Sequence, residues 1–172
     1  MLEYQNILAK SDGTSLLQHL KDVADAAFVF AQNIGIDAEL VRKGAILHDI
    51  GKVSPLFQKT LKGNTEPGFV FRHEIASLMF ISLVDEAERP AIIEMIVAHH
   101  KSISQDDGEK GLLDLEDIID SFDRHSQKWD EWSGNALEIL KVLGFDTHAI
   151  NKEEAENNYY YAVDYCENLK HG

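Results

Sequence analysis

The sequence predicts an all-α domain. Apolar residues recur at intervals of three and four along most of the 172-residue chain, and this spacing places side chains on one face of an α-helix. Residues that commonly begin or end helices flank several of these stretches. No stretch alternates convincingly between apolar and polar residues, as a half-buried strand would. We therefore expect one compact bundle of several helices over residues 1–172.

Local signals place five helices in the first part of the chain. Gly35 ends the first helix, Asp37 can cap the second, and Ser54 followed by Pro55 opens a short third helix. The expected ranges are 16–34, 37–47, 54–61, about 71–83 and from 90 to about 100, with a loop at 63–68.

The C-terminal third gives weaker signals. Residues 101–111 are polar and are expected to form a loop, while "LLDLEDIIDSF" and "NALEILKVLGF" are expected to be helical. A last helix begins where Asn151 and Glu154 stand at capping-box spacing. Its periodicity predicts a buried face made of Ala155, Tyr159, Ala162, Cys166 and Leu169.

Composition and charge exclude several classes of protein. The net charge of −14 argues against a general nucleic-acid coating protein, because phosphate binding normally uses a basic surface. Residues 42–101 are nevertheless near neutral, with 8 bases and 7 acids. No run of ~18 apolar residues could cross a membrane, and no signal peptide is visible. The single cysteine excludes an internal disulfide, so we expect a cytoplasmic protein.

Four of the eight histidines are predicted to point toward one interior from four different helices. Burying several unpaired imidazoles is costly, and a transition-metal ion removes that cost because neutral imidazole is a good ligand. These four are His19, His48, His73 and His100. Three others stand in polar surroundings or at the tail and are expected to be exposed: His125, His148 and His171.

Adjacent ligand pairs suggest a site for two cations. His48-Asp49 and His99-His100 are such pairs, and neighbours on a helix lie ~100° apart, so both members can contact the edge of one cavity. A carboxylate supplies negative charge and two oxygens that can bridge two ions. Two cations ~4 Å apart suit the hydrolysis of phosphate esters. Lys52 stands one turn after His48, where it can contact a phosphate or offset a helix dipole.

Four segments resemble a known family in order along the chain. They are "ILAKSDGTSLLQHLKDVA", "GAILHDIGKVSPLFQK", "FRHEIASLMF" and "IVAHH". They are similar to the HD nuclease domain of the CRISPR-associated type I interference nuclease–helicase, within the HD phosphohydrolase superfamily, and "HDIGKVSPLFQ" is the most specific piece. The resemblance covers residues 7–101. It implies a helical HD domain that cleaves single-stranded DNA. The implied partners are a helicase domain, in cis or in trans, and a CRISPR RNA-guided surveillance complex.

The resemblance also implies a ligand set for two divalent ions. One ion would be held by His19, His48 and Asp49. The other would be held by Asp49, His73, His99 and His100, with Asp49 as the bridge and catalytic carboxylate, and Lys52 would support the phosphate. This histidine-rich set favours Mn, Fe, Co or Ni over Mg.

One ligand of the family pattern is left open by the sequence. The family closes its first metal site with a late Asp, and the helical periodicity turns the best candidate, Asp164, away from the buried face. The other candidates are Asp114, Asp117 and a position beyond Gly172. No helicase motif is visible, so we expect either an excised domain or a stand-alone nuclease subunit.

Two other functions remain open at this point. The first is an HD phosphohydrolase that acts on a small nucleotide, although no residues that would read a base or ribose can be identified. The second is a non-catalytic metal-binding scaffold, which a missing late carboxylate would favour.

Overall fold

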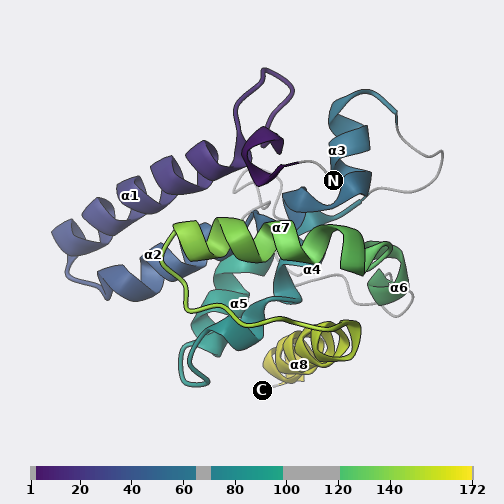
Figure 1. Ribbon diagram of the computed structural model, residues 1–172. Helices are drawn as coiled ribbons and strands as arrows, with labels where there is room; N and C mark the ends of the chain where they lie inside the picture. The colour runs from purple at the N-terminus through teal and green to yellow at the C-terminus, as the bar shows by residue number, and fades with distance from the viewer. Residues whose placement is uncertain (1–2, 65–70, 99–120, 172) are drawn as a thin grey trace.

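The computed structural model describes residues 3–64, 71–98 and 121–171. Within these ranges the chain is helical, with one isolated bridge between Leu8 and Ser15 and no strand. The all-α prediction is therefore confirmed. Figure 1 shows α1 (Leu16–Ile34) and α2 (Ala38–Leu47) as a hairpin that projects from the other helices.

The other elements follow the predicted order, with one difference. They are η1 (Tyr4–Asn6), η2 (Ile50–Val53), α3 (Pro55–Leu61), α4 (His73–Leu78), η3 (Ile81–Leu83), α5 (Arg89–Ala98), α6 (Ser121–His125), α7 (Trp129–Val142) and α8 (Lys152–His171). The single helix expected at about 71–83 is instead split into α4 and η3. The backbone leaves the helical region at Phe80 (φ −106°, ψ 8°), and the Phe80 ring packs against Trp129 with centroids 5.2 Å apart.

Three predicted helix boundaries have the expected chemistry. Gly35 adopts a left-handed conformation (φ 75°) and its N–H closes α1. The Asp37 carboxylate accepts hydrogen bonds from the first N–H groups of α2. Ser54 caps α3, and Pro55 occupies the first turn of that helix. The polar loop expected at 101–111 lies outside the described residues, as does most of "LLDLEDIIDSF".

The core lies among the helices that surround η2 and α4 (Figure 1), and the α1–α2 hairpin reaches it only with its inner end. Leu16 and Leu20 are fully buried, whereas Phe30 and Ile34 are 63% and 54% exposed. Phe30 and Ile34 continue the apolar spacing of Leu16 and Leu20 along the helix, but they do not face the interior. The outer half of α1 packs mainly against α2, and the side of α1 that carries Phe30 and Ile34 is exposed.

The last helix buries the face that its periodicity predicted, except at its end. Ala155, Tyr159, Ala162 and Cys166 are fully buried. Leu169 is 43% exposed, so burial stops about one turn earlier than expected. Within the described part of the chain, no helix combines the length and apolar character needed to cross a membrane.

Glu154, in the first turn of α8, is hydrogen-bonded to neighbouring segments, and its ionisation should make the free energy of unfolding depend on pH. Burial raises the pKa of Glu154, but hydrogen bonds donated by His148 Nε2 (2.8 Å) and Ser82 Oγ (2.9 Å) outweigh it and lower the pKa below 4.5. The stabilisation is therefore complete above pH 4.5 and is lost as the pH falls through the folded-state pKa. We expect Glu154→Gln to lower the melting temperature more at pH 7 than at pH 3, as followed by circular dichroism. An equal loss at both pH values would contradict this assignment.

Candidate metal centre

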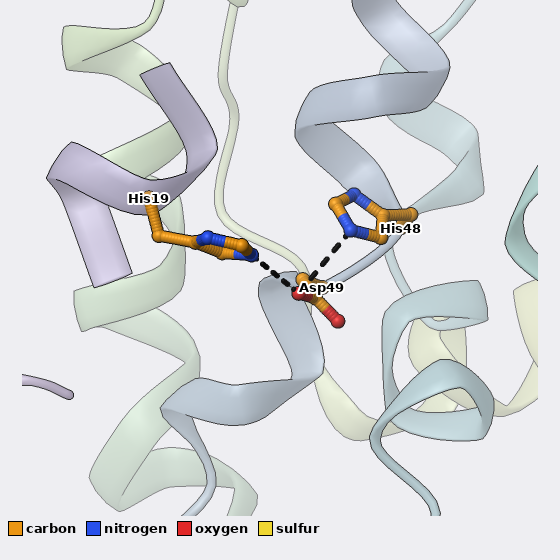
Figure 2. Close-up of side chains that lie close together, drawn as sticks. All are labelled: His19, His48 and Asp49. Atoms are coloured by element: carbon orange, nitrogen blue, oxygen red, sulfur yellow. Dashed lines mark hydrogen bonds and ion pairs between the residues drawn. The ribbon is translucent and has the colours of Figure 1, made fainter. Parts of the chain in front are cut away.

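Asp49 is the centre of a group of side chains that come from separate helices. It stands between the end of α2 and the start of η2 and is only 3% exposed. His19 of α1 places Nε2 2.9 Å from Asp49 Oδ2, and His48 places Nε2 3.2 Å from the same oxygen. Figure 2 shows the two imidazoles approaching the carboxylate from different sides. Potential ligand atoms of these three residues all lie within 4.8 Å of one another.

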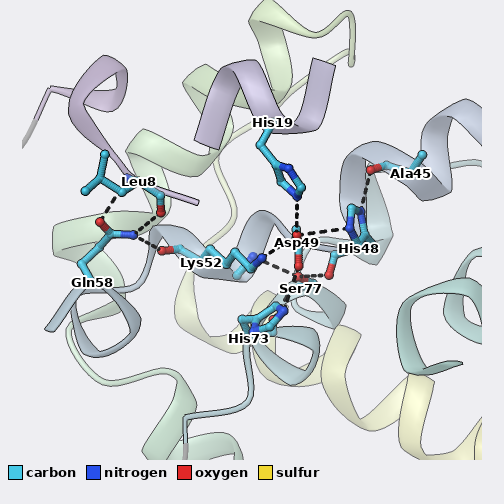
Figure 3. Close-up of polar contacts among 10 residues, drawn as sticks. Leu8, His19, Ala45, His48, Asp49, Lys52, Gln58, His73 and Ser77 are labelled. Atoms are coloured by element: carbon cyan, nitrogen blue, oxygen red, sulfur yellow. Dashed lines mark hydrogen bonds and ion pairs between the residues drawn. The ribbon is translucent and has the colours of Figure 1, made fainter. Parts of the chain in front are cut away.

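A third imidazole and an ammonium group complete this cluster (Figure 3). His73, the first residue of α4, places Nε2 2.8 Å from Asp49 Oδ1. Lys52 Nζ lies 2.7 Å from Asp49 Oδ2, and the Lys52 side chain is only 12% exposed. The structure therefore brings together five of the residues that the sequence singled out. We call them the Asp49 cluster: His19, His48, Asp49, Lys52 and His73.

Backbone packing beneath the Asp49 cluster fixes His73 relative to His48. Gly51 N–H donates to Ser77 Oγ (2.9 Å), and Ser77 Oγ lies 3.0 Å from the His73 carbonyl and 3.1 Å from the His48 carbonyl. Ser77 is fully buried. A Cβ on Gly51 would overlap the His73 carbonyl oxygen, so only glycine allows this approach. Sequence reasoning missed Ser77. A small polar residue within the apolar stretch "IASLMF" is the signal that could have indicated it.

A buried acid lies next to His73. Glu74 is buried, and it accepts a hydrogen bond from Arg72 Nε at 2.6 Å. Burial raises the pKa of Glu74, but the neighbouring guanidinium and its hydrogen bond outweigh that effect and hold the pKa below its usual value. Glu74 is therefore ionised near neutral pH, and the Arg72 guanidinium beside it balances its charge.

The donor set of the cluster suits a divalent transition ion. The Ala45 carbonyl can only accept, so His48 Nδ1 donates to it (2.6 Å), which leaves Nε2, on the side of Asp49, as the nitrogen that could bind a metal ion. Three imidazole nitrogens therefore surround one carboxylate. Imidazole with carboxylate is a common ligand set for Mn, Fe, Co, Ni and Zn. His19, His48 and Asp49 would hold such an ion, and His73 lies on the other carboxylate oxygen.

The remaining predicted ligands and histidines fall into two groups, those outside the described residues and those within them. His99, His100, Asp114 and Asp117 lie outside the described residues, so their roles stay predictions. Asp164 is described and is exposed on α8, as its periodicity predicted. His148 is exposed, as expected, and the side chain of His171 is not described.

His125 differs from the prediction. It was expected to be exposed, but it is only 2% exposed. Its Nε2 accepts the backbone N–H of Arg72 (2.9 Å), and its ring packs on Phe71 with centroids 4.9 Å apart. The prediction was wrong because α6 packs against the start of α4 and buries His125 and Ser126, although Asp123 and Arg124 stay exposed.

Asp164→Ala should leave metal binding unchanged, because the carboxylate is exposed on α8 and is no part of the Asp49 cluster. Calorimetric titration of Mn²⁺ into stripped protein would measure this. Loss of a bound ion in the variant would show that Asp164 is a ligand and that the last helix moves or repacks when metal binds.

Comparison with known proteins identifies the family. A family model described as "HD domain" matches residues 16–143, which include every member of the Asp49 cluster. The chain belongs to the HD domain family. Proteins named Ribonuclease Y are similar to this HD domain. The protein from Chlorobium phaeovibrioides is 31% identical over 107 residues, which cover 62% of this chain and 18% of the relative.

Other relatives give the same picture. The Ribonuclease Y proteins of Treponema denticola and Fusobacterium nucleatum are each 31% identical over 109 residues, covering 63% of this chain and 19% of the relative. The chain thus spans about a fifth of the length of the curated relatives it matches. No solved structure matches the chain significantly. The broader resemblance to HD proteins is therefore confirmed, and the finer one to the CRISPR-associated nuclease stays a prediction.

Proposed function

We propose that this HD domain hydrolyses phosphodiester bonds in single-stranded nucleic acid with the help of divalent transition-metal ions. The observation that carries the proposal is the convergence of three imidazoles and a lysine on one buried carboxylate. When bound there, the ions would supply a nucleophilic water at neutral pH and neutralise charge on the phosphate.

Each member of the Asp49 cluster has a role in this proposal. Asp49 supplies the negatively charged carboxylate to which the ions would bind. The Ala45 carbonyl fixes the ring of His48, so that Nε2 faces the carboxylate. Lys52 brings an ammonium group to the edge of the cluster, where it can contact a phosphate oxygen as a point charge. The His19 and His48 side chains are each 15% exposed, so a substrate can reach this edge.

Two kinds of nucleic acid are candidates for the substrate. DNA is the first candidate, because "HDIGKVSPLFQ" resembles the CRISPR-associated nuclease and implies cleavage of a displaced DNA strand. A helicase domain and an RNA-guided surveillance complex would then be the partners. RNA is the second candidate, because the relatives that cover this domain are named Ribonuclease Y.

A substrate panel with excess Mn²⁺ tests the proposal. The panel would contain a circular single-stranded DNA, an RNA of the same sequence and a set of nucleotides, including cyclic ones. We expect cleavage of at least one polynucleotide and none of the nucleotides. Hydrolysis of nucleotides alone would favour a small-molecule phosphohydrolase. Metal binding without any hydrolysis would favour a scaffold.

A further inference from the structure

A basic segment adjoins the metal centre in an otherwise acidic chain. The chain carries 30 acids against 16 lysines and arginines, yet residues 50–64 contain three lysines and no acid. Lys52 belongs to the Asp49 cluster. The other two, Lys59 and Lys62, stand at the end of α3, and we call this pair the α3 ridge.

Helix α3 is fixed directly against the metal centre. The Phe57 ring meets the His73 ring edge-on with centroids 5.1 Å apart, and Lys52 Nζ lies 5.6 Å from the centre of the same phenyl ring. Gln58 Nε2 donates to the Lys52 carbonyl (2.8 Å). Figure 3 shows Gln58 on the side of the cluster from which Lys52 reaches Asp49. The α3 ridge therefore has a defined position relative to the cluster.

Gln58 also fastens the N-terminal segment to α3. Its Oε1 accepts the Leu8 N–H (3.1 Å), and its Nε2 donates to the Leu8 carbonyl (2.8 Å). Gln58 is only 6% exposed. Lys10, two residues after Leu8, is exposed and lies close to Asp12. Hydrogen bonds from Thr14 are the main cause that lowers the pKa of Asp12, and the positive charge of Lys10 contributes to the same shift. Lys10 therefore adds little net positive charge.

The α3 ridge is available to a ligand. Lys59 and Lys62 are exposed, and neither has an acidic partner within the described part of the chain. Residues three apart share one face of a helix. From Pro55 to Lys62 the helix rises by about 10 Å, so the two ammonium groups lie within reach of a strand that extends a few nucleotides beyond the metal centre.

We propose that the α3 ridge binds the phosphates of a single-stranded polynucleotide on one side of the bond that the Asp49 cluster cleaves. This inference rests on the proposed function, and it adds where the strand runs and why a strand is a better substrate than a free nucleotide. The charge of Lys59 and Lys62 complements phosphate, whereas acids dominate the chain as a whole.

A simpler role for the same lysines is stabilisation of α3. Cations near the end of a helix interact favourably with its exposed carbonyl groups. In that case their loss would lower the melting temperature without changing the preference for long substrates. The two roles therefore predict different results for the same variant.

The test uses Lys59→Gln/Lys62→Gln together with the control Lys141→Gln. Lys141 is exposed near the end of α7, where Arg42 of α2 donates to the Leu143 carbonyl, and Figure 1 shows this end of α7 on the far side of the molecule from α3. Binding of a labelled single-stranded oligonucleotide to metal-free protein would be followed by fluorescence anisotropy over a range of salt concentrations. Cleavage of a long oligonucleotide and hydrolysis of bis(p-nitrophenyl) phosphate would be measured in Mn²⁺.

We expect the double variant to bind the oligonucleotide roughly tenfold more weakly than the parent does. The plot of log affinity against log salt concentration should also be less steep by about 1.4, because each of the two lost phosphate contacts accounts for about 0.7 of the slope. Its ratio of oligonucleotide cleavage to small-ester hydrolysis should fall by a similar factor. The control should match the parent in both measurements.

The inference would be overturned if the double variant had the same oligonucleotide affinity, salt dependence and ratio of cleavage rates as the parent. If only its melting temperature fell, the two lysines would be assigned to the stability of α3. Failure of the parent to hydrolyse either substrate would overturn the proposed function, whatever the binding measurements show. The two failures are therefore distinguishable.

Discussion

Asp49→Asn should abolish hydrolysis and weaken metal binding by more than ~100-fold, since even the loss of a partner outside the ligand set costs 10–100-fold in comparable sites. The variant keeps the size of the side chain but removes the charge that three imidazoles and Lys52 surround. We expect the far-UV circular dichroism to stay helical, because the neighbouring core residues are unaffected.

The matched control for this variant is Asp25→Asn. Asp25 lies on α1 and pairs with Lys21 on the surface, where both side chains are more than half exposed. Such pairs contribute little to stability, so the control should keep the activity and metal affinity of the parent. An Asp49→Asn protein that still cleaves at a near-parental rate would refute the role of Asp49 as the shared carboxylate.

Gly51→Ala should destabilise the protein by about 3 kcal/mol, at the upper end of the range for overpacked sites. The added methyl group would overlap the His73 carbonyl oxygen and lie 2.8 Å from Ala76 Cβ and 2.9 Å from Ser77 N. These are largely backbone atoms of α4, so relief requires that helix to move away from η2. The melting temperature should fall by about 10 °C, and metal affinity should fall because His73 moves relative to Asp49.

Gly134→Ala provides the control for that substitution. Gly134 lies within α7, and a Cβ there would meet no other heavy atom within 4 Å. Alanine in a helix interior is better by about 0.5–1 kcal/mol than glycine, so this variant should be equal to or more stable than the parent. Thermal and urea denaturation of both variants would measure the difference. Equal melting temperatures for Gly51→Ala and the parent would show that η2 and α4 are not tightly packed.

The local parts of this fold could be predicted from the sequence. A helix cap depends on a few adjacent residues, which is why Asp37 and Ser54 were assigned correctly. The convergence of His19, His48 and His73 could be inferred because each lies on the apolar side of its own helix. Helical periodicity also oriented Asp164 toward solvent.

The errors arose where burial depends on distant segments. Phe30 has apolar periodicity but is 63% exposed, because the hairpin of α1 and α2 projects from the core. His125 has polar neighbours, yet the Arg72 N–H needs an acceptor and the Phe71 ring covers the imidazole. Ser77 was missed because its hydrogen bonds join Gly51 to two carbonyl groups that the sequence does not place together.

The measurement that most directly tests whether the Asp49 cluster is a metal centre is a calorimetric titration of Mn²⁺ into metal-stripped protein. The cluster predicts saturable binding of at least one ion, with a second ion bound more loosely, and loss of the firm binding in Asp49→Asn. Heats that do not exceed dilution, or the same binding curve in the parent and in Asp49→Asn, would contradict the assignment of this cluster as the metal centre.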